Sequence, residues 1–181
     1  MNKRKVILFI SQSLDGFIND RTGGVDWIGG IDESYDSDYG YEDFIQGVDT
    51  AIFGRRTYSQ IVDDLSPEYW VYDDLESYVL THEKKEDKTN IHFVSMNVKE
   101  LISSLLKKPG RNIWICGGAD LINQCVNENL IDEYHITTVP ILLGEGIRLF
   151  DRGHQPVRLM LESVREENGL ITAIYSRPDA F

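Results

Sequence analysis

The chain has 181 residues, a formal net charge of -12 and a sequence pI near 4.7, with 41% hydrophobic and 27% charged residues. This composition is ordinary for a globular protein, and the length suits a single domain spanning 1–181. The negative charge disfavours nucleic acids and anionic membranes as partners, because both need basic surfaces. The first residues, 1–14, hold only a short apolar run that ends in polar side chains. We therefore expect no signal peptide, no membrane span and a cytoplasmic location.

The N-terminal part begins with a predicted strand and continues into an irregular segment. Val6 to Gln12 is an apolar run suited to a central strand, and Phe17 and Ile18 form a further apolar pair after a turn. Glycines, aspartates and tyrosines then dominate residues 23–43. Such residues favour turns and irregular backbone, and we interpret this segment as a lid over the site.

The rest of the chain alternates between short apolar strands and helices. Helices are predicted at 41–47, 57–64, 98–107 and 119–127, and strands at 51–53, 77–81, 91–95, 113–116 and 133–139. Near the C-terminus, two β-rich runs flank Asn168-Gly169, a strong hairpin signal, and predict paired strands at 158–164 and 170–175. The pattern predicts an α/β fold with a mostly parallel sheet, flanking helices and an antiparallel hairpin at one edge.

A double glycine stands between the buried strand at 113–116 and the amphipathic helix that starts at Ala119. Gly117 and Gly118 free the backbone from side chains at this junction. A helix N-terminus offers unpaired N–H groups and the positive end of a dipole, so it can hold an anion without a basic residue. The same pattern also fits an ordinary strand-to-helix turn, and both interpretations remain open at this point.

A second strand ends in a similar turn that carries positive charge. Gly54 is followed by Arg55, Arg56 and Thr57. Arginine presents a planar fork of donors that suits phosphate, and threonine adds a hydroxyl. The alternative is that both arginines are solvated and the threonine caps a helix. A dinucleotide carries a pyrophosphate, and in its phosphorylated form a further 2′-phosphate, so separated anion sites at one sheet edge are what it would need.

Cysteines and histidines give no sign of a metal site. Cys116 and Cys125 do not form a CxxC pair. A role as small core residues is favoured for both, over a role as a reactive thiol or in a disulfide. The four histidines are widely spaced and show no metal-ligand pattern. We therefore predict no metal.

Five motifs occur in an order that resembles a known group of proteins. They are SQSLDGFI at 11–18, GRRTY at 54–58, LTH at 80–82, WICGGADLI at 114–122 and DEYHITTVPILLGEG at 132–146. Together they resemble the dihydrofolate reductase-like superfamily, in the branch of the reductase domain of bifunctional riboflavin biosynthesis proteins. The resemblance covers nearly the whole chain. It implies a three-layer α/β/α fold that binds NADPH at the carboxyl ends of its strands and reduces a pterin-like or other heterocyclic substrate.

The resemblance also implies which residues bind the cofactor. Those expected at the phosphates are Gly54, Arg55, Arg56, Thr57, Thr81 and His82, although the family often has an Arg at the position of His82. Those expected at the nicotinamide and pyrophosphate are Gly117, Gly118, Ala119, Asp120, Leu121 and Ile122. In related reductases a cis peptide joins this glycine pair. Ser11 and Ile18 are expected near the carboxamide and ribose, with Asp15-Gly16 as the turn between them.

The substrate side departs from both related patterns. Cys116 stands where riboflavin-pathway reductases carry a Glu. Folate reductases place a carboxylate on the helix ahead of the G-R-x-T motif, and the candidates for that role are Asp38, Glu42 and Asp43, each of which also fits a surface acid. An apolar substrate wall is predicted from Phe9, Trp27 and Phe44, any of which could instead be core.

Two function hypotheses follow. The first is an NADPH-dependent reductase of a small pterin-like or ribosylaminopyrimidine-like heterocycle. The second is a non-catalytic NADP-binding or ligand-sensing protein on the same fold, and a third possibility is a structural domain without cofactor affinity. A homodimer is predicted from the apolar run Ile136–Leu143, although a central strand would look the same.

Overall fold

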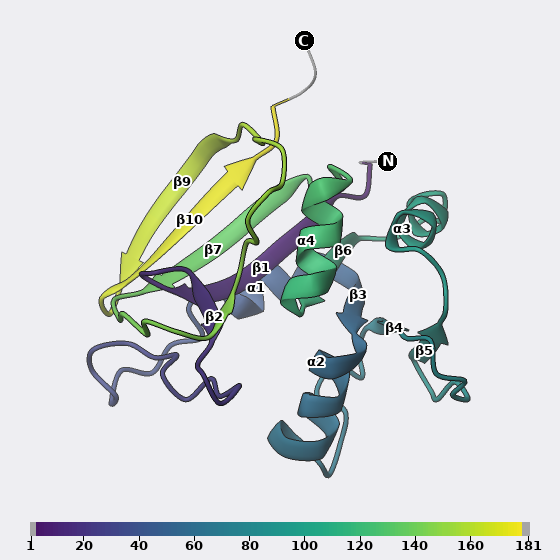
Figure 1. Ribbon diagram of the computed structural model, residues 1–181, viewed down its shortest axis with the longest axis horizontal. Coiled ribbons are helices and arrows are strands. Elements are labelled where there is room, and N and C mark those ends of the chain that lie inside the picture. The colour runs from purple at the N-terminus through teal and green to yellow at the C-terminus, as the bar shows by residue number, and fades with distance from the viewer. Residues whose placement is uncertain (1–2, 179–181) are drawn as a thin grey trace.

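The computed structural model describes residues 3–178, which form an eight-stranded sheet in the order β5-β4-β3-β6-β1-β7-β10-β9 (Figure 1). Its strands are β1 (Val6–Ser13), β3 (Val48–Gly54), β4 (Glu76–Leu80), β5 (Ile91–Val94), β6 (Asn112–Gly117), β7 (Glu133–Val139), β9 (Met160–Glu167) and β10 (Leu170–Ser176). The pairings from β5 to β7 are all parallel, and β10 joins β7 and β9 antiparallel. The predicted mostly parallel sheet with a C-terminal hairpin is confirmed.

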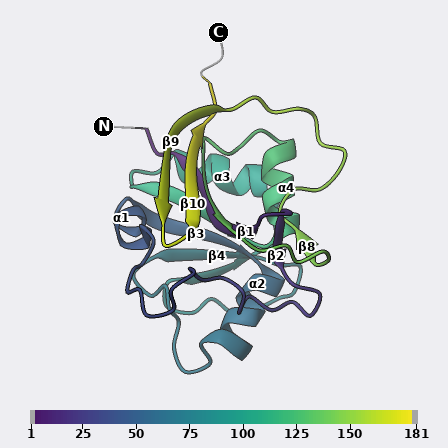
Figure 2. The same cartoon turned by 90° about the vertical axis from the view of Figure 1, so that its left-hand side faces the viewer.

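Helices cover both faces of this sheet. The helical elements are α1 (Tyr41–Gln46), α2 (Arg55–Gln60), the π-helical turn η1 (Ile61–Leu65), α3 (Val98–Leu106) and α4 (Ala119–Asn127). The buried side chains of α3 and α4 belong to one core cluster, and those of α1, α2 and η1 belong to another. Figures 1 and 2 show these two groups of helices with the sheet between them. The three-layer α/β/α arrangement is confirmed.

The first strand shows why the apolar runs are continuous rather than alternating. Val6 and Leu8 pack toward α3 and α4, whereas Ile7 and Phe9 pack into the opposite cluster. Successive strand residues point to opposite faces, and here both faces are covered. A strand of this kind must therefore be apolar at every position, which is what the sequence pattern indicated.

Element ends differ from the predictions in two places that matter. Helix α2 begins at Arg55 instead of Thr57, which places both arginines in its first turn. The hairpin strand β9 begins at Met160 and continues to Glu167. It extends this far because Asn168 and Gly169 adopt φ angles of 50° and 81°, the left-handed pair of a two-residue hairpin turn.

The first half of the apolar run that suggested a dimer lies inside the sheet. Ile136 to Val139 belong to β7, which pairs with β1 on one side and β10 on the other. Ile136 and Val139 are both buried. The first half of the run is thus explained by the central strand, whereas Leu142, which lies beyond β7, is exposed, and the homodimer stays a prediction.

The irregular segment predicted as a lid is tied to the tip of the hairpin. The N–H of Ile31 donates to the Asn168 carbonyl at 3.0 Å, and the N–H of Asp32 donates to the Asn168 side-chain oxygen at 2.9 Å. The Asn168 amide nitrogen donates to the Tyr39 hydroxyl at 2.9 Å. Figure 2 shows this segment running beneath the β9–β10 tip.

A small second sheet holds the first turn against a later loop. It pairs β2 (Phe17–Asn19) with β8 (Ile147–Arg148) and was not predicted. The approach is closest at Gly146, where a Cβ atom would lie 2.1 Å from the backbone oxygen of Asn19. The φ angle of Gly146 is +147°, a conformation that side chains disfavour. Only glycine therefore fits at this position.

Replacing Gly146 by Ala should lower the free energy of unfolding by about 1–3 kcal/mol more than replacing Gly144 by Ala. Both glycines have positive φ, but a Cβ at Gly144 meets nothing within 4 Å, whereas one at Gly146 meets the backbone. Urea denaturation of the two variants measures the difference. Equal losses would show that β2 and β8 separate without cost.

Candidate functional site

A cleft of about 980 Å³ lies where β3, β4, β5 and β6 end. Its wall consists of Asn19, Thr22, Gly23, Gly54, Arg55, Arg56, Thr57, Ser59, Gln60, Asp63, Asp64, Leu80, Thr81, His82, Val94, Ser95, Met96, Asn97, Gly118, Ala119, Asp120, Leu121, Gln124 and Ile147. The carboxyl edge of a parallel sheet is where open α/β folds bind nucleotides. The volume is that of a site for a small molecule or cofactor.

The two predicted anion turns meet in this cleft. Strands β3 and β6 are parallel neighbours, and Phe53 pairs with Gly117 near their ends. A Cβ on Gly118 would lie 3.0 Å from the Thr57 hydroxyl oxygen, and one on Gly54 would lie 3.5 Å from the Gly118 nitrogen. The peptide between Gly117 and Gly118 is cis, as the resemblance implied. The glycines thus allow the first turns of α2 and α4 to approach each other.

Arginines mark one side of the cleft. Arg55 and Arg56 are exposed in the first turn of α2, while Tyr58 one turn further on is buried. Helix geometry keeps the arginines in solvent, because the buried side of α2 faces the sheet. Their guanidinium groups provide charge-assisted donors at the rim of the cleft.

The loop after β4 forms the neighbouring rim. Thr81 is buried, and its N–H donates to the Val94 carbonyl at 3.0 Å, which fixes the loop to the end of β5. His82 is exposed beside it. The structure thus brings the predicted phosphate contact at Thr81 and His82 into the same cleft as the arginine turn.

Some residues predicted at the cofactor do not line the cleft. Ile122 is fully buried, and it packs with Ile18 in the core cluster under α3 and α4. Ser11 is half-buried within β1, opposite Thr137, and Gly117 is buried just behind Gly118. Motif matching selected Ile122 because it is adjacent to cleft residues, but the helix turns its side chain toward the core.

Sequence reasoning missed several parts of the cleft wall, including one segment after β5 and one in η1. Residues 95–97 follow β5, and Asp63 and Asp64 lie in η1, beyond the arginine turn. The segment after β5 could have been found, because β5 is parallel to β4 and its end must reach the same edge. No signal pointed to the two aspartates, since their position depends on how α2 continues.

The turn between β1 and β2 is organised by a single carboxylate. Asp15 accepts hydrogen bonds from the Ser13 hydroxyl at 2.6 Å, from the N–H of Leu143 at 3.1 Å and from the N–H of Gly144 at 2.7 Å. The Ser13 hydroxyl, followed by these amides, lowers the pKa of Asp15 to about 2, against an ordinary value of 3.8. Asp15 and Gly16 thus form the predicted connecting turn and bind it to the loop after β7.

An aromatic group covers the sheet face on the side of α1. Phe9 stacks on Phe44 with ring centroids 4.2 Å apart and planes 17° apart, and Trp114 meets Phe44 edge-on at 5.5 Å. Tyr41 and Tyr72 flank Trp114 at 6.2 Å and 5.3 Å. Phe44 is buried, whereas Phe9 remains half-buried.

Trp27 lies apart from this group in the irregular segment. Its indole N–H donates to the Gly24 carbonyl at 3.2 Å. No aromatic contact joins it to Phe9 or Phe44 among the rings described in residues 3–178. The three residues predicted as one substrate wall are therefore separated. Phe9 of β1 and Phe44 of α1 stack on each other, whereas Trp27 belongs to the loop.

The carboxylate candidates face solvent. Asp38 accepts hydrogen bonds from the N–H groups of Gly40 and Glu42, which fixes the start of α1. Glu42 and Asp43 are exposed, because Tyr41 and Phe44 occupy the side of α1 that packs on the sheet. The structure thus favours the surface-acid interpretation for all three.

Both cysteines are free and neutral. Cys125 lies on the buried side of α4, and burial raises the pKa of its thiol to about 12. Cys116 ends the aromatic face beside the glycine turn, and burial likewise raises its pKa to about 12, with a smaller opposing effect from the Tyr72 hydroxyl. Burial, and then Cys116, raises the pKa of both Tyr41 and Tyr72. This end of the aromatic face therefore carries uncharged thiol and hydroxyl groups at neutral pH.

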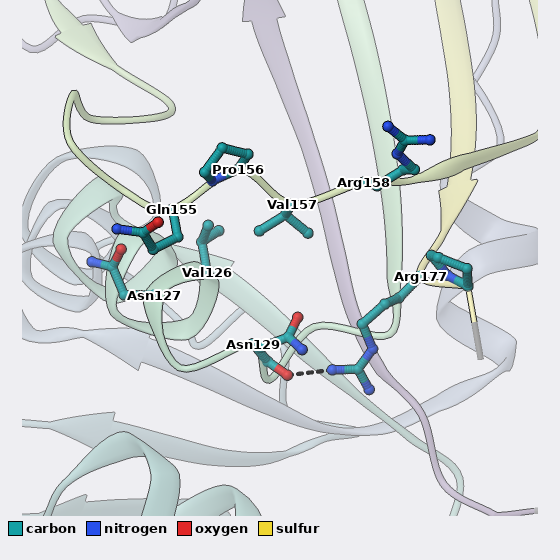
Figure 3. A pocket seen from close by; sticks show the side chains of 9 residues that line it. Val126, Asn127, Asn129, Gln155, Pro156, Val157, Arg158 and Arg177 are labelled. Carbon is teal, nitrogen blue, oxygen red and sulfur yellow. Dashed lines mark hydrogen bonds between the residues drawn. The ribbon is translucent and has the colours of Figure 1, made fainter. Parts of the chain in front are cut away.

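A second hollow, of about 700 Å³, lies at the far end of α4 (Figure 3). The guanidinium groups of Arg158 and Arg177 point in opposite directions there. Arg177 already pairs with Asp132 at 2.8 Å and donates to the Asn129 carbonyl. The polar groups of this hollow do not converge, and it shares none of the motif residues.

Within residues 3–178, no three His, Cys, Asp or Glu side chains are gathered so that they could hold a metal ion. Among the same residues, no helix has the length and apolar character needed to cross a bilayer.

Comparisons with known proteins agree with this geometry. A family model, the RibD C-terminal domain, matches residues 57–170. The uncharacterized protein YwjB of Bacillus subtilis (strain 168) is 36% identical over 177 residues, which cover 97% of this chain and 99% of YwjB. The uncharacterized protein YyaP of the same organism is 31% identical over 185 residues, covering 97% of this chain and 96% of YyaP.

Solved structures show the same fold. A protein of Shewanella sp. PV-4, provisionally named a riboflavin biosynthesis protein, has a TM-score of 0.85 and 28% identity, and the match covers 97% of this chain and 99% of that one. The diaminohydroxyphosphoribosylaminopyrimidine deaminase/5-amino-6-(5-phosphoribosylamino)uracil reductase of Thermotoga maritima has a TM-score of 0.71 and 13% identity, covering 97% of this chain and 57% of that one. The fold is dihydrofolate reductase-like, in the riboflavin-reductase branch.

Replacing Asp15 by Asn should loosen the loop after β7 and flatten the dependence of stability on pH. A folded-state pKa of about 2 means that the Asp15 carboxylate stabilises the fold above pH 4 and loses this effect as the pH falls toward 2. We expect faster amide exchange at Leu143 and Gly144, and a smaller fall in Tm between pH 6 and pH 3 than in the wild type. Asp26→Asn, which removes an exposed carboxylate of the same type, is the control. A variant with unchanged exchange would contradict the role of Asp15.

Proposed function

Because the chain belongs to the RibD C-terminal domain family, we propose that it is an NADPH-dependent reductase that passes a hydride to a small heterocyclic substrate. The observation that carries the proposal is the meeting of the two anion turns. Gly118 and Thr57 approach closely at the carboxyl edge of the sheet, so that a Cβ on Gly118 would lie 3.0 Å from the Thr57 hydroxyl oxygen, and Arg55 and Arg56 line the same cleft.

The donors around the cleft fit a phosphorylated dinucleotide. Helix α4 begins after Gly118, and its first N–H groups, with the Thr57 hydroxyl beside them, suit a pyrophosphate. The arginines of α2, with Thr81 and His82, would hold the 2′-phosphate. When bound, the cofactor supplies the hydride, and the chain contributes position and electrostatics.

The substrate side is proposed at the aromatic face beside the glycine turn. Phe9 offers a half-buried ring supported from below by Phe44, and Cys116 and Tyr41 border it with neutral polar groups. A flat, uncharged heterocycle suits such a face, because it can stack on the ring and hydrogen bond to the hydroxyl. Pterin-like and ribosylaminopyrimidine-like compounds belong to this class.

One observation favours a second candidate, a non-catalytic NADP-binding or ligand-sensing protein. The acids of α1 face solvent, so the carboxylate that assists proton delivery in folate reductases has no counterpart on that helix. The two candidates differ in turnover. A reductase oxidises NADPH in the presence of an acceptor, whereas a sensor binds NADPH and leaves it unchanged.

Titration with NADPH and NADH, followed by tryptophan fluorescence, tests the cofactor site. We expect NADPH to bind at least tenfold more tightly than NADH, because the 2′-phosphate makes charge-assisted hydrogen bonds with arginine. The losses of NADPH affinity caused by Arg55→Ala and by Arg56→Ala should together amount to about tenfold or more. The same substitutions should weaken NADH binding less. Arg152→Ala, an exposed arginine outside the cleft, serves as the charge-matched control. Absence of binding to either dinucleotide would refute the cofactor assignment.

Turnover is measured separately by NADPH absorbance with dihydrofolate, a ribosylaminopyrimidine and other heterocycles as acceptors. Oxidation with any of them supports the reductase. Tight NADPH binding without oxidation by the whole panel would favour the sensor.

A further inference from the structure

An acidic side chain next to the cleft is paired with one of the two arginines. Glu83 Oε1 lies 3.3 Å from Arg55 Nη1, and Glu83 Oε2 lies 3.4 Å from Lys85 Nζ. The side chains of Arg55 and Glu83 are 47% and 51% exposed. The carboxylate thus sits on a guanidinium that the proposed function assigns to a phosphate.

The local backbone puts Glu83 in this position. Thr81 is anchored to the end of β5, and its hydroxyl accepts a hydrogen bond from the N–H of Glu83 at 3.1 Å. This contact turns the chain sharply after β4 and directs the next side chains toward the start of α2. The position of Glu83 is therefore built into the loop, although its side chain is half exposed.

We propose that Glu83 is an internal competitor for the cofactor's 2′-phosphate and that it sets how strongly this protein prefers NADPH to NADH. The inference rests on the proposed function, since it takes the cleft as the dinucleotide site. It concerns a residue outside the motifs that point to the cofactor.

Charge explains how the exchange would occur. A carboxylate carries one negative charge, whereas a phosphate monoester carries nearly two and has three acceptor oxygens, so the phosphate is the stronger partner for Arg55. Breaking the exposed Arg55–Glu83 ion pair costs little free energy, because exposed ion pairs contribute little to stability. NADH carries no 2′-phosphate, so it has no group that would displace Glu83 from Arg55.

Lys85 can hold Glu83 near the site after a phosphate has replaced it on Arg55. Its ammonium group lies 6.0 Å from the Tyr58 ring centroid and 5.7 Å from the Phe93 ring centroid, so it is held above two aromatic faces. Glu83 can remain paired with this lysine when a phosphate takes Arg55. The carboxylate would then stay near the phosphate and repel it, which weakens NADPH binding throughout.

The test compares Glu83→Gln with Glu86→Gln in the full chain. Glu86 is exposed in the same loop and lies within 4.0 Å of no basic side chain among residues 3–178, so its variant removes the same charge without freeing Arg55. We expect Glu83→Gln to lower the Kd for NADPH about three- to tenfold and to change the Kd for NADH less than about twofold. Glu86→Gln should change neither Kd more than about twofold.

Arg55 provides the second arm. In an Arg55→Ala background, Glu83→Gln should no longer tighten NADPH binding, because the group for which Glu83 competes is gone. Equal effects of the two glutamine variants, or equal tightening of NADPH and NADH, would overturn the inference while leaving the cofactor assignment intact. If neither wild type nor Glu83→Gln binds either dinucleotide, the proposed function and this inference both fail.

Discussion

The close approach of Gly118 and Thr57 is the constraint on which the cleft depends. It exists because β3 and β6 are parallel neighbours, so that the helices that follow them start at the same edge of the sheet. Side chains at Gly54 and Gly118 would fill the space between those helix starts. With glycine at both places, the two helix starts and Thr57 border one cleft, and the proposed function takes this arrangement as an anion site.

The two faces of the sheet differ in the side chains that pack on them. Aliphatic side chains of α3 and α4 form the core on one face, whereas rings dominate the face under α1 and α2. Aromatic side chains offer flat apolar area together with hydroxyl groups at its margin, so this face can be stable and also receive a flat ligand. Cys116 lies where the aromatic face reaches the glycine turn, and its neutrality keeps this junction free of charge.

Much of this organisation could be predicted from the sequence, because it depends on local patterns. Helix α4 and strand β7 have the predicted bounds, since glycines and turn residues mark their ends clearly. Three features could not be predicted: the pairing of β2 with β8, the hydrogen bonds between Asn168 and the irregular segment, and the position of Glu83. Each of these is a contact between distant segments whose geometry is set by the folded sheet, and periodicity carries no information about it. Ile122 shows the same limit, because a motif gives neighbours in sequence while the helix decides which side chain faces the cleft.

The acidity of the chain bears on how such a cleft would select an anion. With a net charge of -12, the surface as a whole repels a dinucleotide phosphate at long range. The cleft itself mixes Arg55 and Arg56 with Asp63, Asp64 and Asp120. Charges of opposite sign in one cleft oppose each other, and salt screens what remains beyond a Debye length of about 8 Å, so selection has to occur at contact, through oriented donors. A competing carboxylate on Arg55 is effective in this setting, because it acts at the same short range as the phosphate that would replace it.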